Sequence, residues 1–195
     1  LLALATVPPY ERGKGAMLMS CWLTVIGIGE DGLSGLGDTA RKAIANAAVV
    51  FGGKRHLEFL DASVKAERIA WPSPFEEAFA MLEALRGKPV VVLASGDPMN
   101  YGMGASLARR FSADDMLVVP FPSSFSLAAA RLGWPLQDVR CLSAHGRPLE
   151  LLASHILPGE RLLILSWDGK PPQKVAQMLD RKSGVEGKRG GHKVR

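Results

Sequence analysis

The side chains best suited to bind a polar ligand follow a run of apolar residues that predicts a buried strand. Ser95-Gly96-Asp97-Pro98 comes directly after the apolar segment 89–94. Glycine permits close approach of a backbone, aspartate accepts hydrogen bonds, and proline fixes the direction in which the chain leaves. A simple turn explains these four residues equally well. The following Tyr101-Gly-Met-Gly segment favours a ligand-binding loop.

Two more segments place polar residues after predicted strands. Ser123 and Ser124 precede a predicted helix, where a hydroxyl caps the free N–H groups or helps to bind a carboxylate or a ribose. His145 and Arg147 follow the next strand in a glycine-bounded loop. A lone histidine is usually structural, but an arginine two residues later suits an acidic ligand. Both interpretations remain open for each segment.

The first glycine-rich loop has the sequence pattern of a dinucleotide-binding motif but lacks the structural context that such a motif requires. Gly27, Gly29 and Gly32 form a G-x-G-x-x-G pattern after a strand. The next helix is predicted to begin only near Asp38, and the second strand lacks the acidic residue that binds a ribose. A tight turn therefore explains the glycines, and an NAD-dependent oxidoreductase is the alternative hypothesis.

Short β-branched runs alternate with amphipathic helical patterns along the chain, which predicts an α/β fold with mainly parallel sheets. Open sheets of this class bind ligands beyond the carboxyl ends of their strands. The predicted strands span residues 22–28, 48–51, 68–70, 89–94, 116–119, 139–142 and 162–165.

A polar stretch near residues 111–115 predicts a boundary between two small lobes. The first lobe is expected to span 19–112 and the second 113–181. Residues 1–18 and 182–195 lack periodicity and are expected to be disordered or non-native tails. These tails also hold the net charge of +5, because the intervening residues balance, and this argues against a nucleic-acid-binding surface.

The composition excludes several other classes. No apolar run approaches the roughly 20 residues that span a bilayer, and the apolar start lacks a basic leader, so we expect a cytoplasmic protein with no membrane partner. Cys21 and Cys141 lie far apart and indicate neither a disulfide framework nor a metal site. The sequence indicates no catalytic triad, and no catalytic residue is assigned.

Taken in order and spacing, these loops resemble the tetrapyrrole (corrin/porphyrin) methylase family, over about residues 21–181. The likeness is to the amino-terminal half of the decarboxylating members that methylate precorrins at C5 and C15. Four segments carry it: 25–33, 94–102, 122–134 and 142–147. The family's first loop commonly has proline where this chain has Glu30.

The resemblance implies two α/β lobes with S-adenosylmethionine in the cleft between them, a homodimer, and methylation of a precorrin at C5 in cobalamin biosynthesis. It implies cofactor contacts from Ser95, Gly96, Asp97, Asn100, Ser123, Ser124 and Trp167. It implies substrate contacts from Gly27, Gly29, His145 and Arg147. Further cationic candidates for the substrate carboxylates are Arg41, Lys42, Lys54 and Arg55.

The resemblance also implies a partner domain. Family members continue into further strands after Arg181, so the second lobe is expected to be incomplete here. A carboxyl-terminal domain for the second methylation and the decarboxylation is expected in the full enzyme. A truncated, non-catalytic binding domain is the remaining alternative.

Overall fold

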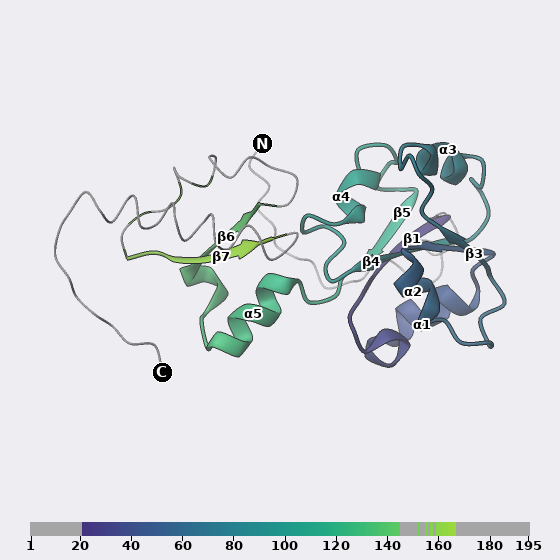
Figure 1. The fold of residues 1–195 in the computed structure, drawn as a ribbon. Helices are drawn as coiled ribbons and strands as arrows, with labels where there is room; N and C mark the ends of the chain where they lie inside the picture. The colour runs from purple at the N-terminus through teal and green to yellow at the C-terminus, as the bar shows by residue number, and fades with distance from the viewer. Residues whose placement is uncertain (1–20, 145–151, 153–154, 156, 158, 167–195) are drawn as a thin grey trace. The chain divides into compact units, whose positions relative to one another are not determined.

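The structure is a computed structural model that describes residues 21–144, 152, 155, 157 and 159–166 (Figure 1). The chain divides into two compact units, Leu1–Ser123 and Ser124–Arg195. Each unit is described by itself. Within the described part of the chain, no helix is both long and apolar enough to cross a membrane.

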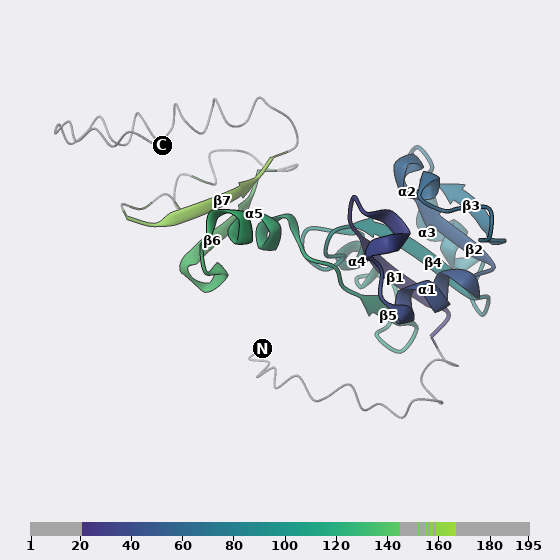
Figure 2. The same ribbon diagram turned by 90° about the horizontal axis from the view of Figure 1, so that it is seen from below.

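The first unit is a five-stranded parallel sheet in the order β3-β2-β4-β1-β5, whose strands lie side by side in Figure 2. Its strands are β1 (Leu23–Ile28), β2 (Val49–Gly52), β3 (Glu67–Ala70), β4 (Val90–Ser95) and β5 (Met116–Val119). Its helices are η1 (Gly32–Gly35), α1 (Asp38–Ala45), α2 (Lys54–Glu58), α3 (Glu77–Glu83) and α4 (Met103–Leu107).

Helices cover both faces of this sheet, with α3 and α4 on one face and α1 and α2 on the other (Figure 1). Successive residues of a strand point to opposite faces, so a central strand covered on both faces needs apolar residues in both sets of alternate positions. In β4, Val90 and Val92 pack beneath α3 and α4, while Val91 and Leu93 pack against the opposite layer. The sheet is therefore buried on both faces and fixes the loops at its edges.

The second unit contains a two-stranded parallel sheet in the described residues. Its elements are α5 (Ser124–Leu132), η2 (Leu136–Asp138), β6 (Val139–Ser143) and β7 (Arg161–Leu165). A small cluster around Ala144 and Leu152 packs with Leu142 and Ile164. At the start of the two strands, Arg140 forms an ion pair with Glu160 at 2.6 Å.

The predicted α/β class is confirmed, and the seven predicted strands agree with the structure to within about a residue at most ends. The predicted lobe boundary is not where the structure places it. β5 pairs with β1 in the first sheet, and the first unit extends to Ser123. The polar stretch near residue 112 is a turn in which the Ser112 hydroxyl bonds to Asp115, not a linker. Both predicted tails lie outside the described residues.

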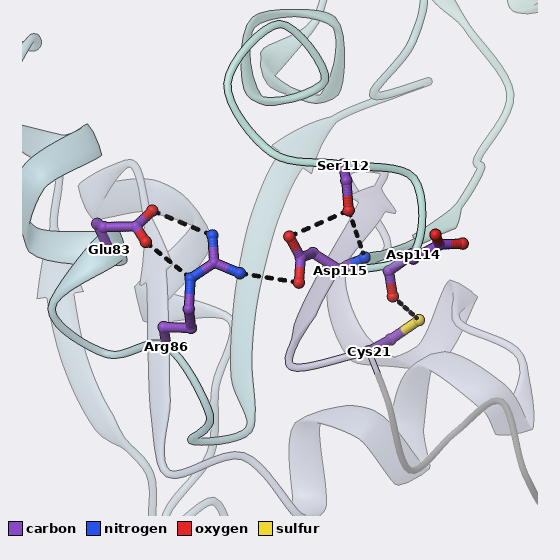
Figure 3. A network of polar contacts seen from close by, with 6 residues as sticks. All are labelled: Cys21, Glu83, Arg86, Ser112, Asp114 and Asp115. Atoms are coloured by element: carbon purple, nitrogen blue, oxygen red, sulfur yellow. Dashed lines mark hydrogen bonds and ion pairs between the residues drawn. The ribbon is translucent and has the colours of Figure 1, made fainter.

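A polar network joins the end of α3 to the loop before β5 (Figure 3). Arg86 donates hydrogen bonds to Glu83 at 2.7 Å and to Asp115 at 2.8 Å. Its guanidinium also lies 5.3 Å from the centre of the Trp22 ring. These contacts lower the pKa of Glu83 and of Asp115, in each case mainly through the hydrogen bond from Arg86. The network thus fixes the amino-terminal edge of the sheet.

Replacing Arg86 by alanine is expected to lower stability at pH 7 and to flatten its acid dependence. A carboxyl whose pKa is lower in the folded state stabilises the fold above its unfolded pKa, and this contribution disappears as pH falls through the folded value. The difference between wild type and Arg86→Ala in urea midpoint should therefore shrink between pH 7 and pH 3. Below the folded pKa values of both carboxyls, the part that remains reports the lost packing on Trp22.

Arg109→Ala is the matched control, because this arginine is exposed and forms no ion pair in the part of the chain that the structure describes. Its midpoint should follow that of the wild type at both pH values. An Arg86→Ala effect that is the same at pH 7 and pH 3 would contradict a stabilising role for the two carboxylates.

Candidate functional site

The two central strands of the first sheet, β1 and β4, define a switch point. After β1 the chain crosses over β4 to reach β2, and after β4 it crosses over β1 to reach β5. The loops that leave these neighbours therefore diverge, and ligands of open α/β sheets bind in the crevice beyond such a pair. The backbone N–H of Gly96 donates to the Ile28 carbonyl at 3.0 Å, which ties the two loops together.

The β4–α4 loop holds four of the predicted cofactor contacts. Ser95 ends β4 and is exposed, although the preceding five residues of the strand are buried. Gly96 has a φ of 60°, a left-handed conformation that favours glycine. Asp97 Oδ1 accepts a hydrogen bond from the Met99 backbone N–H at 2.8 Å, and Asn100 is exposed in the same loop. The structure thus brings these four residues together at the switch point.

Tyr101 in this loop was not among the predicted site residues. Its φ of 55° is unusual for a residue with a side chain, and such conformations concentrate at binding and catalytic sites. The following Gly102 allows the loop to fold back, since a Cβ there would lie 2.7 Å from the Pro98 carbonyl oxygen. The loop is therefore tightly wound and presents a half-exposed aromatic ring.

Phe121, in the segment after β5, occupies the space next to Gly27 in β1 and Gly29 just after it. A Cβ on Gly27 would lie 2.2 Å from the Gly96 carbonyl oxygen and 2.8 Å from the Phe121 nitrogen. A Cβ on Gly29 would lie 2.5 Å from the Phe121 ring. Close approach by protein atoms therefore accounts for both glycines in this structure. Their contact with substrate stays a prediction that requires Phe121 to move.

Two side chains after β2, those of Arg55 and His56, reach this same edge, and their contacts there were not predicted from the sequence. His56 Nε2 lies 2.9 Å from Ser95 Oγ, and Arg55 pairs with Glu30 at 2.7 Å. His56 is half-buried, and its pKa is lowered mainly by burial and next by the charge of Arg55; Glu30 and the Leu93 backbone oppose the shift. The polar run Lys54-Arg55-His56, which follows the two glycines at the end of a buried strand, is the sequence signal that could have identified them.

Three other predicted residues lie in α1 or at the start of α5. Ser123 is buried and immediately precedes α5, which begins at the exposed Ser124. Arg41 donates to the carbonyl oxygens of Leu36 and Ser34, so it holds its own loop. His145, Arg147 and Trp167 lie outside the described residues.

The sequence of this chain is similar to those of several methyltransferases. A precorrin-6Y C(5,15)-methyltransferase [decarboxylating] from Sinorhizobium sp is 52% identical over 162 residues, which are 83% of this chain and 39% of that protein. A cobalt-precorrin-7 C(5)-methyltransferase from Salmonella typhimurium is 36% identical over 135 residues, which are 68% of this chain and 67% of that protein. The chain therefore spans about two fifths of the length of the first relative.

A solved structure agrees with this likeness. The precorrin-6Y methylase from Archaeoglobus fulgidus has a TM-score of 0.59 and 26% identity, and the match covers 80% of this chain and 78% of that one. The family described as Tetrapyrrole (Corrin/Porphyrin) Methylases matches residues 22–187, which include every described element. The chain belongs to the tetrapyrrole methylase family.

Proposed function

We propose that this chain carries the S-adenosylmethionine-dependent activity that methylates a precorrin macrocycle at C5 in cobalamin biosynthesis. One observation carries the choice of C5. The longer relative is named for two methylations and a decarboxylation, whereas the shorter one, of which the chain covers 67%, is named for methylation at C5 alone. C5 methylation is the activity common to both names.

The switch-point loop suits the proposed cofactor. Ser95 offers an exposed hydroxyl, Gly96 leaves its backbone accessible, and Asn100 offers an exposed amide. The carboxylate of Asp97 has one oxygen engaged with Met99, and its other oxygen has no hydrogen bond to any described residue. These groups match the ammonium and hydroxyl groups of S-adenosylmethionine. Contacts from Ser123, Ser124 and Trp167 stay part of the proposal.

The proposed reaction depends more on how this chain aligns the reactants than on acid–base catalysis. When bound, S-adenosylmethionine supplies an electrophilic methyl group, and an electron-rich ring carbon of the substrate is the nucleophile. The protein then contributes by holding the reacting atoms in line and by excluding water. For this reason we assign no general base to the methyl transfer.

Cationic side chains must recognise the carboxylates of the substrate. Arg41 donates to a backbone carbonyl oxygen of its own loop, and Arg55 forms an ion pair with Glu30. Lys42 and Lys54 are exposed and form no ion pair among the described residues. We therefore rank the two lysines above the two arginines. His145 and Arg147 remain proposed substrate contacts. The homodimer, the carboxyl-terminal partner domain and the cytoplasmic location are likewise proposals.

The direct test is mass spectrometry of a precorrin incubated with the chain and methyl-labelled S-adenosylmethionine. We expect one labelled methyl group per macrocycle, located at C5 by NMR. A second methyl group or loss of carbon dioxide would contradict the assignment to C5 alone. Thermal stabilisation by S-adenosylhomocysteine without methyl transfer would indicate a non-catalytic binding domain, and stabilisation by NAD alone would indicate the oxidoreductase.

A further inference from the structure

We propose that His56 is a positioning residue: its neutral imidazole holds the Ser95 hydroxyl for ligand binding, and protonation of the ring weakens that binding. The inference rests on the proposed function, because it concerns the edge at which S-adenosylmethionine is placed. It adds to that site a residue from the connection after β2, and it predicts that ligand binding depends on pH.

The contact itself joins two segments that only the fold brings together. His56 lies in α2, after β2, and Ser95 ends β4, the neighbour of β2 in the sheet. Their side chains form a hydrogen bond of 2.9 Å between Nε2 and Oγ. A serine hydroxyl otherwise rotates among three staggered positions, and only some of these face a ligand. The imidazole therefore selects the direction in which the hydroxyl offers its remaining hydrogen bond.

The imidazole is held in a confined place. A Cβ on Gly52 would lie 3.3 Å from the Cβ of His56, so the glycine gives the histidine room against the end of β2. The ring centre lies 6.3 Å from that of Phe59. His56 Nδ1 is buried and forms no hydrogen bond within the described part of the chain. Protonation would make both ring nitrogens N–H donors, and Nδ1 forms no hydrogen bond that would compensate for this. The Leu93 backbone favours the charged ring, but it offsets the effect of burial only in part, so the neutral ring is favoured.

The charges around the ring also favour the neutral form on balance. Arg55 on the same helix disfavours the imidazolium, whereas Glu30 from the loop after β1 and the Leu93 backbone in β4 favour it. Burial is the largest effect and lowers the pKa from its ordinary value. In the neutral ring Nε2 either accepts from or donates to Ser95, while in the charged ring it must donate. Acidification therefore fixes the direction of the bond and adds a positive charge beside the cofactor site.

The test is the affinity of the full chain for S-adenosylhomocysteine, measured by isothermal titration calorimetry between pH 5 and pH 8. Wild-type affinity is expected to fall as the pH drops below the ordinary imidazole value of about 6.5. His56→Gln keeps a hydrogen-bonding group that does not titrate, so its affinity should be near wild type at pH 8 and nearly flat with pH. His56→Ala and Ser95→Ala should lose about three- to tenfold at pH 8, as expected for one hydrogen bond.

His155→Gln is the matched control, since this histidine is exposed and is not one of the proposed site residues; this variant should keep the wild-type pH profile. A second measurement does not depend on variants. If the ligand prefers the neutral ring, saturation with S-adenosylhomocysteine must lower the pKa of His56 measured by NMR, because the coupling is reciprocal.

The outcomes separate the two proposals. No binding of S-adenosylhomocysteine by the wild type at any pH would overturn the proposed cofactor and this inference with it. Binding with an unchanged pH profile in His56→Gln, or wild-type affinity in His56→Ala at pH 8, would overturn the role of His56 alone. An unchanged His56 pKa on saturation would do the same.

Discussion

Asp97→Ala is expected to weaken S-adenosylhomocysteine binding by about ten- to a hundredfold, the loss that follows when a hydrogen bond to a charged group worth about 1.5–3 kcal/mol is removed. The carboxylate has two roles in this loop. Its Oδ1 holds the backbone N–H of Met99, which winds the loop, and its second oxygen is available to the cofactor. Isothermal titration calorimetry at pH 7.5 measures both losses together.

Two further variants separate these roles. Asp97→Asn retains an oxygen for the Met99 N–H but loses the charge, so its affinity should lie between those of wild type and Asp97→Ala. Asp114→Ala removes an exposed carboxylate from the loop before β5 and should bind like the wild type. Equal affinities of Asp97→Ala and Asp114→Ala would remove the main assignment of the cofactor site.

Gly27→Ala is expected to destabilise the first unit by about 3 kcal/mol, at the upper end of the usual range for overpacking. The added methyl would lie 2.2 Å from the Gly96 carbonyl oxygen and 2.8 Å from the Phe121 backbone nitrogen. Both are backbone atoms, which cannot move aside as the end of a flexible side chain does. Urea unfolding followed by tryptophan fluorescence measures the change in midpoint.

Gly37→Ala provides the comparison for this variant. A Cβ at Gly37 meets nothing within 4 Å, and the residue has an ordinary extended backbone before α1. The substitution should cost less than about 1 kcal/mol, the scale of a change at a helix cap. If both variants unfold at the same urea concentration, the contact between the β1 and β4 loops is not the reason for glycine at position 27.

The strands were predictable because their signal is local. Each central strand of the first unit is a mainly apolar run, and polar residues such as Ser95 and Asp97 mark the place where the strand ends. The predicted start of α1 near Asp38 was also confirmed, because residues 38–45 carry their own amphipathic pattern. Local composition is sufficient for features of this kind.

The missed features depend on which strands become neighbours. His56 meets Ser95 only because β2 pairs with β4 although β3 lies between them in the sequence. Phe121 covers Gly29 only because β5 lies beside β1. The lobe boundary was placed too early for the same reason, since pairing of β5 with β1 is not visible in local composition. Sequence periodicity defines elements, and their order in the sheet defines the site.

The strand order also sets the sequence in which the first unit can assemble during synthesis. β1 is made first, yet both of its partners, β4 and β5, are made last. Until the ribosome has released β4, only β2 and β3 can pair, and β1 remains an apolar segment without a neighbour. Pairing between such distant segments is slow and leaves hydrophobic surface exposed in the meantime. The first half of this unit is therefore expected to be prone to aggregation until β4 has been made.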